Sequence, residues 1–304
     1  MAPPAPPAAH GPELRRVTRA AVAVALTLVA VKTAAWLATG SVAIASSAVD
    51  SLMDSFASGL NLWAVNLSLK PADREHRFGH GKAEALAGLV QAAFVLGSAG
   101  FVALEAIARL IDPVELRSGA LGVVVMVLST LATAALLGYQ RRVAKRTGSL
   151  AIKADSLHYA GDLLMNLAVI AGIVLASELG WAWADSAFAV VVAAVIVVGA
   201  VHIARGAIDQ LMDRELPDEV RARILALALS EPVVRDAHDL KTRASGRGIF
   251  IQLHLSMADG LPLGQAHRAG VRVSELIRAE LPNAEVLIHH DPVDDHHPGG
   301  RPPS

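Results

Sequence analysis

The feature that most constrains the fold is a series of six apolar segments, each about 20 residues or longer and so long enough to cross a bilayer. This length is needed because a helix rises about 1.5 Å per residue through a hydrocarbon layer of roughly 30 Å. The composition agrees, since 53% of the residues are hydrophobic and 18% are charged. We predict an all-α bundle of six transmembrane helices at residues 17–39, 42–69, 83–110, 119–140, 151–177 and 182–211.

The composition excludes thiol chemistry and shows no strong net charge. It contains no cysteine, which excludes disulfides and thiolate metal sites, so any metal must be held by histidine and carboxylate groups. The net charge is −1 at pH 7, and we predict no nucleic-acid partner. The partners expected from composition are the lipid bilayer and small ions.

The lysines and arginines fall mainly in alternate connections between the predicted spans. Such residues collect in short cytoplasmic loops. The opposite connections hold only Arg109 and Arg117. We therefore predict that both termini are cytoplasmic. The basic residues that favour this orientation are Arg15, Arg16, Arg19, Lys70, Arg74, Arg77, Lys82, Arg141, Arg142, Lys145, Arg146 and Lys153.

The two ends of the chain differ in composition from the spans. Residues 1–16 are rich in proline and alanine, and we predict a disordered leader there. The transmembrane domain is expected to cover residues 17–211. A soluble cytoplasmic domain follows at 212–292, and residues 293–304 form a predicted disordered tail.

The soluble segment carries the pattern of a small α/β domain. The stretch LPDEVRARILALALSE is typical of an amphipathic helix that ends at Pro232. VVRDAHDLKTRAS and GIFIQLHLSM alternate apolar and polar residues, as half-buried strands do, and a turn at 245–248 joins them. A helix from Pro262 to Leu281 and the strand AEVLIHHDP follow. The order αββαβ predicts a two-layer domain with an antiparallel or mixed sheet.

Four side chains of metal-ligand type lie inside two of the apolar segments. Asp50 and Asp54 stand four residues apart, as do His158 and Asp162, so each pair shares one face of a helix. An ionisable group at membrane depth is costly and by default marks a functional site. Two such pairs that face each other would supply four ligands.

This set of four is suited to a divalent metal ion. One histidine and three carboxylates fit tetrahedral Zn²⁺, and could also take Cd²⁺, Co²⁺, Fe²⁺ or Mn²⁺. The alternative is that the polar groups only form hydrogen bonds between helices. Placing two acids and a His–Asp pair at membrane depth costs more free energy than hydrogen bonds between helices would require.

A connection between the second and third spans offers a further cluster. Asp73, His76 and His80 lie in KPADREHRFGHGKAE, where Gly79 and Gly81 let the backbone fold the two histidines toward one ion. The alternative is an exposed basic loop without a ligand. Three protein ligands predict a weaker, partly hydrated site.

The soluble domain also contains histidines in a metal-binding pattern. His289 and Asp291 are two residues apart on a predicted strand and so share a face, while His290 points the other way. Any single histidine is more often a surface group than a ligand. The other candidates, from two strands and a helix, are His238, His254 and His267.

Taken together, the motifs resemble the cation diffusion facilitators, in particular their bacterial zinc and iron efflux branch with a cytoplasmic domain. The resemblance covers nearly the whole chain and is specific as a set. It rests on DSLMDSFAS, PADREHRFGHGKAEALAGL, HYAGDLLMN, LMDRELPDE, HDLKTR, IQLHLSM, LPLGQAH and IHHDP, in this order.

The resemblance implies a homodimeric transporter of a bacterial inner membrane, with a ferredoxin-like or metallochaperone-like cytoplasmic domain. It implies transport through the intramembrane set and a second ion at the loop site. It also implies a charge interlock of Lys82 with Asp213. His290 stands where glutamine is expected, so it adds or disturbs a ligand. A binuclear site that joins the two cytoplasmic domains would use His238, His254, His267, His289 and Asp291.

The expected function is efflux of a divalent metal ion by proton-coupled alternating access, with Zn²⁺ as the favoured substrate. Histidine and carboxylate ligands must lose protons to bind metal. His158 is the predicted proton carrier, since histidine has a reference pKa near 6.5. Fe²⁺, Cd²⁺ or Mn²⁺ as the main substrate remains an alternative.

Other classes fit the sequence less well. A membrane metal sensor would need no ligands inside the spans, and a passive channel would show no dependence on a pH gradient. An intramembrane metal hydrolase would need a general base, and neither HExxH nor GxSxG occurs in the spans. We therefore do not expect an enzyme.

Overall fold

The computed structural model describes residues 7–40, 42–111, 120–179, 184–246 and 248–293. The chain divides into two compact units. One is Gly11–Ile208, and the other is built around the residues from Asp209 onward. Each is described below by itself.

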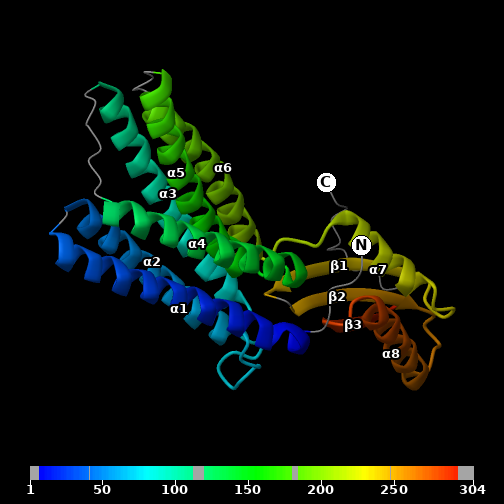
Figure 1. Ribbon diagram of the computed structural model, residues 1–304. Coiled ribbons are helices and arrows are strands. Elements are labelled where there is room, and N and C mark those ends of the chain that lie inside the picture. Colours follow the sequence, from blue (N-terminus) through cyan, green and yellow to red (C-terminus); the bar gives the residue numbers. More distant parts are fainter. Residues whose placement is uncertain (1–6, 41, 112–119, 180–183, 247, 294–304) are drawn as a thin grey trace. The chain divides into compact units, whose positions relative to one another are not determined.

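The first unit is a bundle of long helices (Figure 1). By length and composition, α1, α3, α4 and α6 qualify as membrane spans within the part of the chain that the structure describes. The other two long helices, α2 and α5, are the ones that carry the candidate metal-ligand pairs. The bounds are α1 Pro7–Thr39, α2 Val42–Ser68, α3 Lys82–Ile111, α4 Ala120–Thr147, α5 Leu150–Leu179 and α6 Ala184–Leu211.

Helix α1 begins earlier than the sequence indicated. It starts at Pro7, so the prediction of a disordered leader is wrong for residues 7–16, while residues 1–6 lie outside the described part. The physical reason is packing. Leu14 is fully buried in a cluster with Val65 and Val143, and Glu13 forms an ion pair with Arg146 at 3.0 Å. Burying Leu14 stabilises the extra turns.

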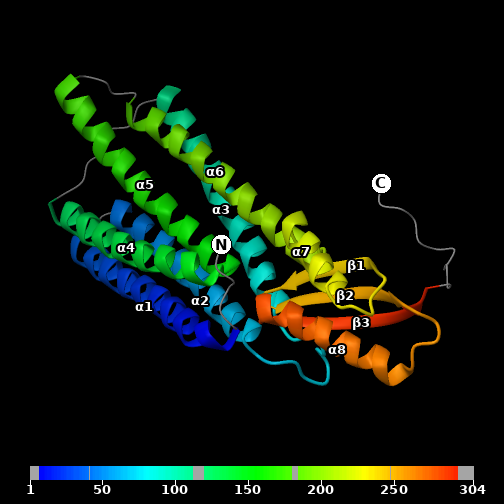
Figure 2. The same ribbon diagram turned by 90° about the vertical axis from the view of Figure 1, so that its right-hand side faces the viewer.

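Helix α5 is the centre of this unit, because it packs on α2, α3 and α4. Figure 2 shows α1, α2 and α4 lying together, with α3 and α6 beside each other. Glycines leave room for side chains where α5 meets α6. A Cβ atom on Gly199 would lie 2.8 Å from Leu157 Cδ1, and one on Gly161 would lie 3.0 Å from Ile196 Cδ1. Small residues at helix contacts are how membrane helices pack closely.

The second unit is an α/β domain with the predicted order αββαβ. Strand β1 pairs antiparallel with β2, and β2 pairs parallel with β3, so the sheet is mixed. This confirms the predicted class. The bounds are α7 Asp218–Leu229, β1 Asp236–Ser245, β2 Gly248–Met257, α8 Leu263–Glu280 and β3 Ala284–Pro292.

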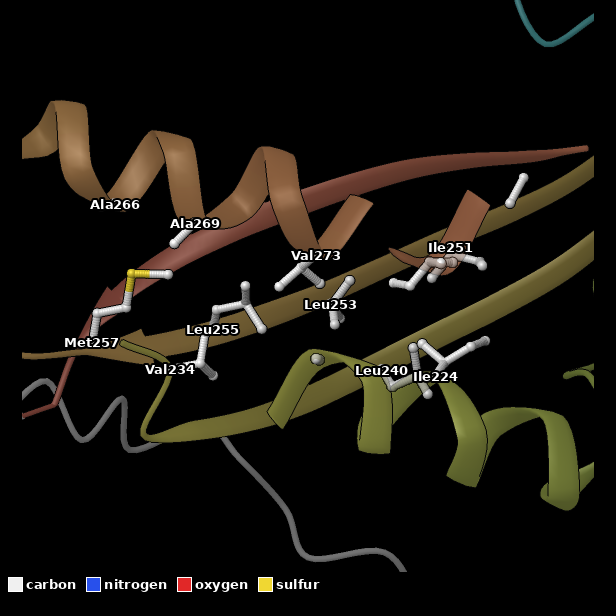
Figure 3. Packing of buried hydrophobic residues seen from close by; sticks show 13 residues of the cluster. Ile224, Val234, Leu240, Ile251, Leu253, Leu255, Met257, Ala266, Ala269 and Val273 are labelled. Carbon is white, nitrogen blue, oxygen red and sulfur yellow. The ribbon is translucent and has the colours of Figure 1, made fainter. Parts of the chain in front are cut away.

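The core of this domain lies between the sheet and both helices (Figure 3). Leu253 and Leu255 of β2 point toward Val273 of α8, and Ile224 contributes from α7. Alternation along β2 sends Gln252 and His254 to the opposite face. One face of the sheet is therefore covered by helices, and the other carries the polar residues.

Candidate metal centres

The intramembrane candidates meet where α2 faces α5. Asp54 Oδ1 lies 2.8 Å from His158 Nε2, and the same nitrogen lies 3.8 Å from Asp162 Oδ2. The three ligand groups are close enough to share one ion. The His158 side chain is only 6% exposed, so this is a buried imidazole between two carboxylates.

Asp50 does not join this tight cluster, although it was predicted with it. It stands one turn before Asp54 on α2 and lines the same cavity, which has a volume of about 660 Å³. His158 and Asp162 line that cavity as well. A cavity of this size has room for an ion with water around it, and Asp50 borders the same space as the three closer groups.

The loop candidates lie together outside the helices. Asp73 Oδ2 is 3.3 Å from His80 Nε2, Asp73 Oδ1 is 3.5 Å from His76 Nδ1, and the two rings are 4.6 Å apart. Gly79, at φ +77°, lets the chain turn between the histidines. The backbone N–H of His76 holds the pKa of Asp73 below its usual range, with help from the amide of Glu75 and from the two histidines. Asp73 is thus an anionic acceptor near neutral pH.

The cytoplasmic candidates gather on the open face of the sheet. Asp291 is the hub, because its carboxylate lies 2.8 Å from His254 Nδ1, 2.6 Å from His289 Nδ1 and 3.3 Å from His238 Nε2. Burial raises the pKa of Asp291, but hydrogen bonds from His254 and His289 outweigh this and leave it below its usual value. The result is a carboxylate surrounded by three imidazoles.

A bulge in β1 makes this arrangement possible. His238 stands opposite His254 and Lys241 stands opposite Gln252, so the register shifts between these pairs. Without the extra residue, His238 would share a face with Leu240 of the core. Asp239 sits in the bulge at φ +45°, and its carboxylate lies 3.6 Å from His254 Nε2.

His267 is not brought to this cluster within one chain. His290 stands opposite Leu255 of the core face, and its Nε2 lies against Gly270 of α8. Burial lowers the pKa of His290, and the charges of His267 and His289 lower it further. His267 belongs to α8, the helix against which His290 packs.

Two domain families together match most of the chain. Residues 18–212 match the cation efflux transmembrane domain, and residues 216–293 match the cytoplasmic domain of cation efflux proteins. The chain belongs to the cation efflux family. This confirms the resemblance drawn from the motifs, and the family places the helical unit in a membrane as a multi-pass domain.

Two relatives, both named as the cation-efflux pump FieF, agree with the family. The cation-efflux pump FieF of Klebsiella pneumoniae subsp. pneumoniae is 44% identical over 283 residues, which cover 93% of this chain and 94% of that protein. FieF of Shewanella oneidensis is 42% identical over 280 residues, covering 92% of this chain and 94% of that one. A solved chain of CzrB in its zinc form is 29% identical and covers 27% of this chain and 96% of its own length, with a TM-score of 0.26.

The charge interlock implied by the family stays a prediction. Lys82 begins α3 in the helical unit, whereas Asp213 belongs to the other unit. Within its own unit, Asp213 adopts φ +56° and its carboxylate lies 3.3 Å from Arg243 Nη1.

Three further residues near the candidate sites were not singled out from the sequence. Lys32 of α1 lines the intramembrane cavity, and Asp239 lies at the sheet cluster. Asp155 is fully buried one turn before His158 and accepts a hydrogen bond from Gln140 Nε2 at 2.5 Å. For Lys32 and Asp155, the available signal was a charged residue inside an apolar segment, the same signal that singled out Asp50 and Asp54.

Proposed function

We propose that this member of the cation efflux family exports Zn²⁺ from the cytoplasm in exchange for protons. The observation that carries the proposal is the His158 imidazole between the carboxylates of Asp54 and Asp162, on the wall of a cavity inside the helical unit. Structural polar contacts between helices do not require three ionisable groups on the wall of a water-accessible cavity.

The ligand chemistry supports a divalent metal as cargo. Carboxylate and imidazole suit Zn²⁺, and also Fe²⁺, Cd²⁺ and Mn²⁺, which are alternative substrates of the same mechanism. Asp50 would complete a set of four ligands in the loaded state. The loop cluster around Asp73 and the sheet cluster around Asp291 are proposed as accessory metal sites.

Proton exchange follows from the same ligands. The site binds metal when His158 and the acids are deprotonated, and protonation of these groups expels the ion. Exporting a divalent ion against about 100 mV, negative inside, costs roughly 4.6 kcal/mol, and inward proton movement offsets part of it. Alternating access around the fixed cavity would then couple the two fluxes.

The proposal includes the setting of the protein. The expected location is a bacterial inner membrane with both termini in the cytoplasm, and the functional unit is a homodimer. The open face of the sheet, which carries the histidine cluster, is the surface proposed to contact a second copy of the chain. His267 of that second copy would then complete the ligand set.

A membrane metal sensor is the second candidate, favoured by the exposed histidine cluster on the sheet. A sensor would bind metal there without moving it. The cavity between α2 and α5 has no role in that function, which is why we rank transport first.

The test is Zn²⁺ uptake into liposomes that contain the purified protein, with and without an imposed pH gradient. Uptake should increase with the gradient and be lost in Asp54→Ala. Leu52→Ala is the matched control, since Leu52 is an exposed neighbour on α2. Binding of Zn²⁺ without uptake in either condition would favour the sensor.

A further inference from the structure

Lys32 is a cationic side chain inside the apolar part of α1. Its Nζ donates a hydrogen bond to Ser51 Oγ at 2.7 Å and another to the Ser47 carbonyl oxygen at 3.3 Å, both on α2. These contacts direct the side chain toward α2 instead of along α1 to the membrane surface. Lys32 is therefore not a residue that only snorkels.

The ammonium group shares the cavity with the candidate ligands. The lining includes Lys32 together with Asp50, Asp54, His158 and Asp162. Among the residues that the structure describes, no ion pair joins Lys32 to an acid, and its hydrogen bonds go to uncharged serine oxygens. It thus adds a positive charge to the cavity without occupying a ligand atom.

The net charge of the cavity explains why a cation at position 32 matters. The residues that line the cavity supply three carboxylates and one ammonium, which leave two net negative charges when the imidazole is neutral. This is the charge that one divalent cation neutralises. Without the ammonium, three negative charges would face the ion. A hydroxyl or amide could tie α1 to α2 at a smaller desolvation cost, so tethering alone does not account for a lysine here.

We propose that Lys32 is a fixed counter-charge of the intramembrane cavity, which matches the cavity to a divalent cation and weakens its binding enough for release. The inference rests on the proposed function, because it assumes that the cavity carries the metal. Lys32 is a positioning charge and not a metal ligand.

Removing the charge should change affinity and turnover in opposite directions. The repulsion between an ammonium and a nearby divalent ion in a protein interior corresponds to a tenfold to hundredfold change in affinity, to order of magnitude. Tighter binding slows release. A lysine that only holds two helices together would instead weaken binding when replaced, because the cavity would lose its shape.

The experiment uses the full-length protein in liposomes, with Zn²⁺ as the probe, and measures KM and the maximal rate of uptake. Lys32→Met keeps the length of the side chain without the charge, and Lys32→Gln keeps a hydrogen-bond donor without the charge. Both should lower KM about tenfold or more and lower the maximal rate. Lys32→Arg should stay close to the original protein. Val31→Met, at an exposed neighbour on α1, is the matched control.

Direct Zn²⁺ binding to the same variants in detergent completes the test. Tighter binding by both neutral variants supports the counter-charge, whether or not uptake is observed. An unchanged or higher KM in Lys32→Gln, or a defect confined to Lys32→Met, overturns it in favour of a tether. If the original protein shows no uptake, the proposed function fails, and the binding measurement still decides the role of Lys32.

Discussion

The cluster between α2 and α5 and the cluster on the open face of the sheet use the same ligand types in different surroundings. In the helical unit, the His158 side chain is 6% exposed and lies on the wall of a cavity that is lined by charged residues. On the sheet, the side chains of His238 and His289 are 45% and 64% exposed, and only Asp291 is well covered. The first site is supplied almost entirely by the chain around it, whereas the second leaves room for donors from elsewhere.

The difference in exposure indicates which function each cluster is suited to. A buried imidazole between two carboxylates on the wall of a cavity can hold an ion inside the helical unit and release it when the helices move. An exposed cluster on a sheet can bind an ion and join a second surface through it. The predictions below test this distinction, in order of decreasing effect.

The largest effect is expected from removing an intramembrane ligand. Asp162→Ala should lower Zn²⁺ uptake about a hundredfold or more, because loss of an outer-shell partner alone costs 10–100-fold at metal sites. Zn²⁺ binding at the sheet cluster should persist, so binding titrations would lose one class of site and keep another. Leu164→Ala, an exposed neighbour on α5, is the control. Retained uptake would remove the distinction between the two regions.

A smaller effect is expected from the buried polar pair beside that site. Asp155→Leu leaves the buried Gln140 amide without its acceptor, which costs roughly 1–3 kcal/mol. Thermal unfolding in detergent should shift to lower temperature. Asp155→Asn can still pair with Gln140 and should unfold close to the original protein. Equal unfolding temperatures for all three proteins would mean that Asp155 does not support the site.

The sheet cluster should act mainly through metal-dependent stability. Asp291→Asn removes the charge that three histidines share, so added Zn²⁺ should no longer stabilise the cytoplasmic domain of the full-length protein. Binding at 100 times the Kd is worth about 2.7 kcal/mol, which a melting measurement resolves. Glu285→Gln removes the same charge from the same strand away from the cluster. Uptake should fall only a few-fold, and a complete loss would contradict the accessory role.

The smallest effect is expected at an ion pair distant from either cluster. Arg272 Nε donates to Glu231 Oε2 at 2.9 Å, and this hydrogen bond holds the pKa of Glu231 below its usual value. A lowered pKa in the folded state stabilises the domain above the unfolded pKa of about 4.5 and loses that stabilisation as the pH falls through the folded value. Melting of the metal-free protein between pH 6 and pH 3 should show this loss. Arg272→Met should remove part of the pH dependence, and an unchanged pH profile would contradict the assignment.

The parts that the sequence predicted are those with a strong period. Spacings of four placed Asp54 on one helix face and His158 with Asp162 on another, and the structure brings these groups together. Alternation along β2 and β3 correctly separated His289 and Asp291 from His290. In both cases the side-chain direction depends only on local backbone geometry.

The parts that escaped prediction depend on contacts between distant segments. The bulge at Asp239 has no periodic signal, yet it decides that His238 faces His254. Leu14 extends α1 only because Val65 and Val143 lie beside it. The direction of the Lys32 side chain depends on its hydrogen bond to Ser51 of another helix. The place of His267 depends on where α8 packs against the sheet. No local pattern carries such information.

The central claim is that metal and protons move in opposite directions through the site built on Asp54 and His158. The most direct test is to load liposomes with a pH-sensitive dye, impose a Zn²⁺ gradient without a pH gradient, and record both fluxes together. We predict that Zn²⁺ entry drives protons out, that the lumen becomes alkaline, and that both signals vanish in Asp54→Ala. Zn²⁺ entry without a change of luminal pH would contradict the account.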